Sequence, residues 1–274
     1  MESAGRLGSC PFARKSTACV ERYYRLNNEA LWRPTKFVIR GGRLRASLDR
    51  TQIGVGSRLV GDAVAACYEQ YVPLHARGRL VDLGCGRAPL YGTYRKHVNS
   101  VTCVDWGGSL HDNPYLDLLA DLNTPLPFAD ASFDTVILSD VLEHLAEPRL
   151  LWAEVQRVLT SDGKLLLNVP FLYRIHEAPH DYARYTDFAL RRFAEQSGLQ
   201  ILVLQPIGGS LAVFADLVGK HLEQGGVVGR AMAACVHAVA SAVIRTGPLR
   251  RADVASAAAF PLGYFMAAVK PATA

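Results

Sequence analysis

The chain has 274 residues, half of them hydrophobic, which suits one globular α/β domain with additions and a sizeable core. The formal net charge is +5, and residues 1–60 hold 12 Lys and Arg against 4 Asp and Glu, which favours an anionic acceptor, a nucleic acid, an acidic membrane surface or an exposed basic face. Six cysteines, at positions 10, 19, 67, 85, 103 and 235, form no CxxC pair, which excludes a zinc site of cysteines and indicates a reduced, cytoplasmic protein.

Seven short apolar runs are typical of β-strands: 79–83, 101–105, 116–120, 134–139, 164–169, 200–205 and 263–270. Helical patterns at 57–72, 147–159 and 187–197 lie between them. This alternation predicts an α/β fold with a doubly wound, mainly parallel seven-stranded sheet covered by helices on both faces. Within it, 161–163 reads as a turn, Thr186 as a helix N-cap and Gly198 as a helix C-cap.

Residues 208–261 separate the last two predicted strands and read as helices at 210–222, 227–244 and 252–260. The longest apolar stretch, 231–244, is short and rich in alanine, and the N-terminus lacks the apolar core of a signal peptide. We therefore expect no transmembrane segment. Peripheral membrane contact, a homodimer seam and simple core packing are the alternatives for this apolar insertion.

The most informative motif is the apolar strand 79–83, which carries Asp82 and ends in a tight turn at Gly84 and Gly86. Glycine is used where the backbone takes a positive φ or approaches a ligand closely. A strand, glycine turn and helix in succession present backbone N–H groups to a ligand. Asp105 ends the next strand, where a doubly wound sheet places a carboxylate over ribose hydroxyls.

From about residue 78 to residue 206 the chain resembles the class I S-adenosylmethionine-dependent methyltransferases, in particular their bacterial small-molecule and sugar branch. Residues 81–86 are similar to the first motif of that family, 104–106 to the second, 121–122 to the adenine position and 133–144 to the fourth-strand motif. The usual third glycine of the family is Ala88 in this chain.

The resemblance implies a Rossmann-like sheet that binds S-adenosylmethionine and releases S-adenosylhomocysteine. The implied cofactor-binding residues are Asp82, Gly84, Gly86, Asp105, Trp106, Asp121, Leu122 and Ser139. Among them, Asp82 is expected to organise the glycine turn and the methionine amino group, and Asp105 to accept from the ribose hydroxyls. Asp121 and the Leu122 amide are expected to contact the adenine.

These expectations divide the chain into four parts. Residues 1–50 form a basic N-terminal segment, expected as helices or as a cap over the cofactor side, with aromatic residues Tyr23, Tyr24, Trp32 and Phe37. Residues 51–207 form the cofactor-binding core, 208–261 the helical insertion and 262–274 the last strand. We also expect the insertion to cover the acceptor pocket and to contribute to a dimer or to the site of an amphiphilic substrate.

The acceptor side is expected in the loop 171–185, which is dense in His, Asp, Tyr and Arg. This loop resembles the Pro-His-Asp-Tyr-x-Arg-Tyr-Thr segment of methyltransferases in polysaccharide and natural-product pathways. A histidine with a near-neutral pKa suits removal of a hydroxyl proton, so His180 is the predicted base, His176 the second candidate and Asp181 an orienting partner. Arg184 is either part of the site or a structural clamp on the loop.

Asp140, Glu143 and His144, with His176 or His180, form an alternative divalent-metal site. It resembles the Glu-x-x-Glu-His set that holds Mg²⁺ or Mn²⁺ in some methyltransferases acting on catechol-like or RNA hydroxyls. The Leu-Glu-His-Leu stretch also occurs widely in metal-free relatives, where the histidine caps or packs, and no metal ligand is predicted.

The sequence therefore predicts O-methylation of a sugar, glycoconjugate or natural product. The alternatives are N- or C-methylation of a small molecule, a catalytically silent methyltransferase-fold scaffold, and an NAD(P) oxidoreductase. The last is disfavoured by the truncated glycine motif. A small-molecule acceptor is expected as the partner, and no nucleic acid, because no RNA-binding module is recognisable.

Overall fold

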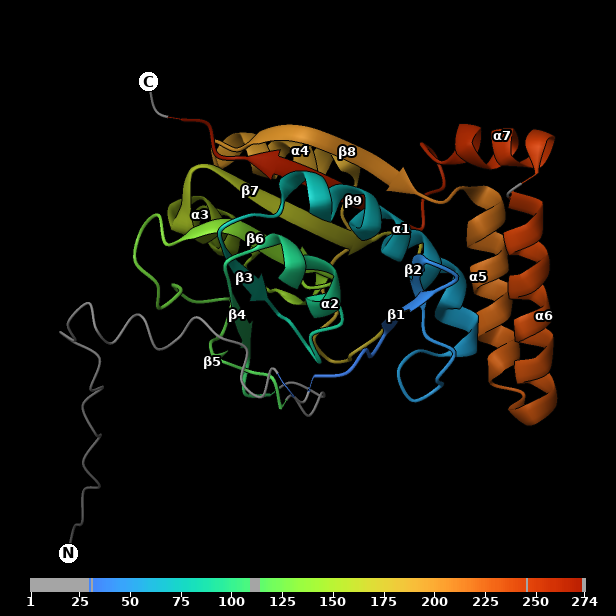
Figure 1. Ribbon diagram of the computed structural model, residues 1–274. Helices are drawn as coiled ribbons and strands as arrows, with labels where there is room; N and C mark the ends of the chain where they lie inside the picture. Colours follow the sequence, from blue (N-terminus) through green and yellow to red (C-terminus); the bar gives the residue numbers. More distant parts are fainter. Residues whose placement is uncertain (1–29, 31, 109–113, 245, 273–274) are drawn as a thin grey trace, which may run out of the picture.

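The structure is a computed structural model that describes residues 30, 32–108, 114–244 and 246–272 (Figure 1). Residues 1–29, including Tyr23, Tyr24 and two of the six cysteines, lie outside the described residues. Cys67, Cys85 and Cys103 are buried, and Cys235 is exposed.

A seven-stranded sheet forms the centre of the fold, in the order β5-β4-β3-β6-β7-β9-β8. Its strands are β3 (Arg79–Leu83), β4 (Ser100–Asp105), β5 (Leu118–Leu119), β6 (Phe133–Ser139), β7 (Leu159–Pro170), β8 (Gln200–Ile207) and β9 (Gly263–Val269). All neighbours pair in parallel except β9, which is antiparallel to both β7 and β8. The predicted doubly wound, mainly parallel sheet is confirmed.

Helices cover both faces of this sheet because each strand alternates its side chains between two apolar clusters. On one face, Val81 of β3 and Leu165 of β7 pack with α3 (Pro148–Val158) and α4 (Asp187–Gln196). On the other face, Leu80 and Leu166 pack with α1 (Arg58–His75) and α2 (Tyr91–Tyr94). The alternation fixes the register of the strands, since a slip by one residue would exchange the two faces.

Two details of the predicted elements are confirmed and two are corrected. Thr186 caps α4 by accepting a hydrogen bond from the Ala189 amide, and Gly198 follows that helix with a φ of +72°. The predicted strand 116–120 is only two residues long. The predicted turn at 161–163 lies within β7, where Asp162 has a φ of +61° and the register against β6 shifts.

The described part of the N-terminal segment forms a hairpin, so the prediction of helices there is wrong. β1 (Phe37–Arg40) pairs with β2 (Arg43–Ala46) across Gly41 and Gly42, whose φ values are +60° and +71°. A Gly-Gly pair of this kind suits the two-residue turn that matches the twist of a hairpin. Phe37 and Leu44 are buried against α1, which holds the hairpin on the core.

The region between β8 and β9 contains α5 (Ser210–Glu223), α6 (Gly226–Ile244) and α7 (Gly247–Ser256), beside the sheet (Figure 1). α5 packs on the short 3-10 helix η4 (Val55–Ser57), where the Glu223 carboxylate accepts from the amides of Val55 and Gly56 at 2.7 and 3.1 Å. The helix expected at 252–260 instead ends at Ser256.

α6 is longer than the apolar run seen in the sequence. With 19 residues and a mean hydropathy of 1.8, it has the length and composition of a membrane-crossing helix, and only 11% of the apolar window is buried. The short length of the apolar run was one reason to expect no transmembrane segment, and the length of α6 removes that reason. Most apolar side chains of α6 that do not pack on α5 are exposed in this structure.

Candidate functional site

A cavity of about 570 Å³ lies beyond the carboxyl ends of β3, β4 and β6, where open α/β sheets bind their ligands. Its volume is within the range of small-molecule sites. All the predicted cofactor-binding residues line it: Asp82, Gly84, Gly86, Asp105, Trp106, Asp121, Leu122 and Ser139. The sheet topology thus brings together four sequence segments that are far apart in the chain.

The glycine turn forms the wall of this cavity next to β3. Gly84 has a φ of +70°, and a Cβ added there would lie 2.4 Å from Cγ2 of Val141. Gly86 also has a positive φ, of 50°. Neither position accepts a side chain without strain, so the turn keeps its backbone exposed to whatever occupies the cavity. Ala88 adopts a positive φ of 49° where the family usually has its third glycine.

Asp105 ties β4 to the glycine turn. Its carboxylate accepts hydrogen bonds from the backbone amides of Gly86 at 3.1 Å and Trp106 at 2.8 Å. The structure therefore gives Asp105, rather than Asp82, the contact with the backbone of the turn. A carboxylate fixed in this way at the end of a strand is well placed to accept hydrogen bonds from hydroxyl groups.

Asp82 is buried on β3 and accepts a hydrogen bond of 2.8 Å from the hydroxyl of Tyr94. Burial raises the pKa of this carboxyl to about 7; the Tyr94 hydroxyl lowers it and the nearby charge of Asp105 raises it. A carboxyl with this pKa gains or loses a proton near neutral pH.

The other predicted residues border the cavity in different ways. Asp121 is exposed, and its carboxylate accepts from the backbone and side-chain amides of Asn123 at 2.9 and 3.0 Å. The Leu122 side chain belongs to the core, so only its backbone is available for a ligand. Ser139 donates to the side-chain oxygen of Asn168 at 2.7 Å.

Ser139 belongs to a polar network with Asn168, Asp140 and Lys36, which the sequence did not predict. Asn168 donates to Asp140 at 2.6 Å, and Lys36 forms an ion pair with the same carboxylate at 2.8 Å. Burial opposes both charges, but their mutual attraction lowers the pKa of Asp140 and raises that of Lys36. Lys36 comes from the segment before β1, and no local pattern in the sequence pointed to it.

His180 faces the cavity from the loop 171–185. Its ring lies edge-on to Trp106, with ring centres 5.1 Å apart, and its Nδ1 lies 3.0 Å from the hydroxyl oxygen of Tyr182. The ring nitrogen held by Tyr182 is Nδ1, so Nε2 is the nitrogen left for a ligand. His180, the predicted base, therefore lines the same cavity as the glycine turn.

His176, the second candidate, does not line the cavity. Asp181 lies 3.3 Å from His176 Nδ1 and also accepts from the His176 backbone amide, so it orients this histidine and not His180. Arg184 holds Asp181 through two hydrogen bonds of 2.5 and 2.8 Å and keeps the pKa of that carboxyl well below its usual range. Arg184 also donates to two carbonyl groups of the loop, as a structural clamp does.

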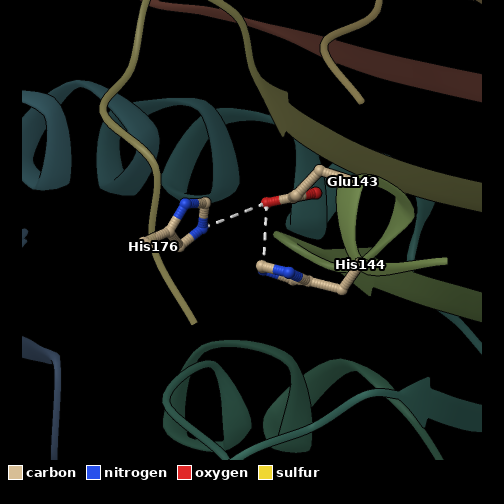
Figure 2. A group of neighbouring side chains, drawn as sticks. All are labelled: Glu143, His144 and His176. Carbon is tan, nitrogen blue, oxygen red and sulfur yellow. Dashed lines mark ion pairs between the residues drawn. The ribbon is translucent and has the colours of Figure 1, made fainter. Parts of the chain in front are cut away.

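Glu143, His144 and His176 meet in a compact group (Figure 2). Oε1 of Glu143 lies 3.7 Å from Nε2 of His144 and 3.6 Å from Nε2 of His176. Burial raises the pKa of Glu143; it opposes the charged form of His176, whose pKa is nevertheless raised by the charge of Glu143. Of the residues that the sequence offered as an alternative metal site, Glu143, His144 and His176 come together. Asp140 instead pairs with Lys36, and His180 faces the cavity.

The helical insertion packs against the loop 171–185. The Lys220 ammonium lies over the ring of Tyr173, 3.4 Å from its centre, and that ring packs edge-on to His176. None of the described residues that line the cavity belongs to 208–261. The described residues of the insertion therefore do not cover the cavity, contrary to the expectation from the sequence.

Comparison with known proteins identifies this arrangement. Residues 81–167 match the family model described as a methyltransferase domain. The core is a class I S-adenosylmethionine-dependent methyltransferase domain. Its cofactor is S-adenosylmethionine. The cavity at the glycine turn lies beyond the carboxyl ends of the strands, where open α/β sheets bind their ligands.

One curated relative and two solved structures illustrate the extent of the similarity. The demethylmenaquinone methyltransferase of Renibacterium salmoninarum is 35% identical over 115 residues, which cover 40% of this chain and 45% of that protein. The chain thus matches less than half the length of this curated relative. A methyltransferase structure from Mesorhizobium loti is 15% identical, covers 77% and 99% of the two chains and has a TM-score of 0.49. The phosphoethanolamine N-methyltransferase 2 of Haemonchus contortus, solved with S-adenosylhomocysteine, is 17% identical, covers 82% and 60%, and has a TM-score of 0.49.

Proposed function

We propose that this methyltransferase methylates a hydroxyl oxygen of a sugar, glycoconjugate or natural product, with His180 as the general base. The observation that supports this proposal is the position of the His180 imidazole in the cavity that also contains the glycine turn and Asp105. A base must reach the acceptor in the same space that holds the methyl donor.

The residues of the cavity fit S-adenosylmethionine in shape and in chemistry. The positive-φ glycines leave a cradle that a Cβ at Gly84 would fill. Asp105 supplies the acceptor for ribose hydroxyls, Asp121 and the Leu122 backbone border the adenine side, and Asp82 serves the amino group. When bound, the cofactor supplies an activated methyl group on a sulfonium sulfur.

In this proposal the protein positions the acceptor and removes its proton. With Nδ1–H of His180 donating to the Tyr182 oxygen, Nε2 keeps the lone pair that takes the hydroxyl proton. The edge-on contact with Trp106 restricts the rotation of the imidazole. Orientation of the acceptor and base in one cavity supplies much of the rate enhancement.

The test is a methyl-donor assay on a panel of hydroxylated acceptors with His180→Ala and, as a control, His221→Gln, which changes an exposed histidine on α5. We expect His180→Ala to lower turnover by about 100-fold or more while the affinity for S-adenosylmethionine stays unchanged. If His176→Ala loses more activity than His180→Ala, the base is His176. Full activity in both variants would show that no histidine base is needed.

A quinone-type acceptor is the second candidate, because the relative from Renibacterium salmoninarum is named for demethylmenaquinone. Methylation would then occur at carbon and not at oxygen. Including a demethylated quinone in the acceptor panel distinguishes the two, since only one of the acceptor classes should gain a methyl group.

A further inference from the structure

The cluster of Glu143, His144 and His176 has the composition of a metal site. The Glu143 side chain is completely buried, and both of its carboxylate oxygens have no hydrogen-bond partner among the described residues. Burying an ionised carboxylate without partners is strongly unfavourable. Separations of 3.6 and 3.7 Å to the two histidines are too long for hydrogen bonds, so a bound cation would stabilise the ionised carboxylate that burial alone disfavours.

Two of the nearby carboxylates are paired with a Lys or an Arg, and the more exposed Glu177 lies 3.9 Å from His144 Nε2. The Asp140 carboxylate is paired with Lys36, and the Asp181 carboxylate with Arg184. Glu143 is therefore the carboxylate whose only close partners in the described chain are two imidazoles. Lys36 and Arg184 also interact with this charge, but each forms its ion pair with another carboxylate, so a bound cation would compensate Glu143 at closer range.

The three ligand atoms are close enough for a single ion to bind after they move together. They lie within 4.8 Å of one another, in a group that Figure 2 shows converging from η6 (Leu142–His144) and the acceptor loop. Bonds of about 2.1 Å in a tetrahedral zinc site place the ligand atoms about 3.4 Å apart. The observed separations from Glu143 are slightly longer, so only a small contraction would be needed.

His144 is oriented as a metal ligand is, and the Nδ1 atom of His176 lies near a carboxylate without forming a hydrogen bond. His144 Nδ1 lies 2.7 Å from the His180 carbonyl oxygen, and His176 Nδ1 lies 3.3 Å from the Asp181 carboxylate. Metal-binding histidines usually direct one ring nitrogen to a carbonyl or carboxylate, which leaves the other nitrogen for the metal. Here both Nε2 atoms are left on the side of Glu143.

We propose that Glu143, His144 and His176 bind one divalent transition-metal ion of the zinc class. Two histidines and a glutamate leave an open position in a four-coordinate site, which can take water or a substrate oxygen. His144 lines the cavity, so this position lies at its edge, on the side of the acceptor loop. The sequence favoured a metal-free site because the Leu-Glu-His-Leu stretch also occurs widely in metal-free relatives. In the structure Asp140 pairs with Lys36 and His180 faces the cavity, which leaves Glu143, His144 and His176 together.

The test uses the full chain, stripped with a chelator and titrated with Zn²⁺ alone in competition with a chromophoric chelator. We expect one equivalent of Zn²⁺ per chain. Glu143→Gln and His176→Ala should each weaken the affinity by about 100-fold or more, whereas His221→Gln should bind like the unmodified protein. Absence of stoichiometric binding by the unmodified protein, or unchanged affinity in His176→Ala, would overturn the proposal.

Substitution with Co²⁺ gives a second readout that does not depend on turnover. A site with two histidines and a carboxylate should give visible absorption bands, and these should be absent in His176→Ala. Circular dichroism and the affinity for S-adenosylmethionine show whether each variant is folded; a misfolded Glu143→Gln protein leaves His176→Ala as the deciding variant. Because no acceptor is present, this result is independent of whether His180 is the base.

Discussion

The raised pKa of Asp82 leads to a quantitative prediction for the variant Asp82→Asn. An asparagine oxygen can still accept the hydrogen bond from Tyr94, but it cannot ionise. The pKa of Asp82 rises from 3.8 in a free side chain to about 7 in the folded protein because the group is buried. The folded protein therefore binds a proton at pH values where the unfolded chain has released it.

The free energy of unfolding that this group contributes is fully present below about pH 4 and is lost as the pH rises to about 7. About three pKa units at about 1.4 kcal/mol each give an upper limit of about 4 kcal/mol. We expect Asp82→Asn to match the unmodified protein near pH 4 and to be more stable by up to this amount near pH 8. The affinity for S-adenosylmethionine should change in the opposite sense, because the asparagine side chain lacks the charge that attracts an amino group.

Urea unfolding without cofactor, at a series of pH values between about 5 and 8, measures the first effect, and calorimetric titration of the cofactor measures the second. The informative quantity is the difference between the two proteins at each pH, since all other titrating groups are common to both. If the two stability curves run parallel across this range, Asp82 does not have a raised pKa and the burial argument is refuted.

Two further outcomes are expected. Asp105→Ala should weaken S-adenosylmethionine binding at least about tenfold in calorimetry while the fold is retained; unchanged affinity would mean that this carboxylate does not hold the ribose. Gly56→Ala should lower the free energy of unfolding by about 2 kcal/mol or more, because the added Cβ would lie 2.6 Å from the Lys220 backbone nitrogen on α5. Gly219→Ala is the control, since its Cβ would have only ordinary contacts with Gly56; equal urea midpoints for both variants would contradict the tight packing of α5.

The core was predictable because its sequence signals are local. The alternation of Leu80 and Val81 between two apolar clusters and the strand-end positions of Asp82 and Asp105 follow from chain order alone. The hairpin at 37–46 was also encoded, in the Gly41-Gly42 pair, but the aromatic and basic residues around it suggested helices.

Contacts between distant segments could not be derived in this way. The ion pair of Lys36 with Asp140 joins residues 104 positions apart, and nothing near Lys36 indicates it. The sequence also could not decide between His176 and His180. Both lie in the same loop, and only the folded path directs one to the cavity and the other to Glu143.

The position of β9 in the sheet has a consequence for the order in which the protein assembles. β9 is the strand that connects β8 to β7, and all seven of its residues are buried. β3 to β7 can pair as they emerge, but β8 has no neighbour in the described sheet until α5, α6 and α7 have been synthesised and β9 follows them. During that interval β8 is an unpaired strand edge, the kind of surface on which newly made chains aggregate.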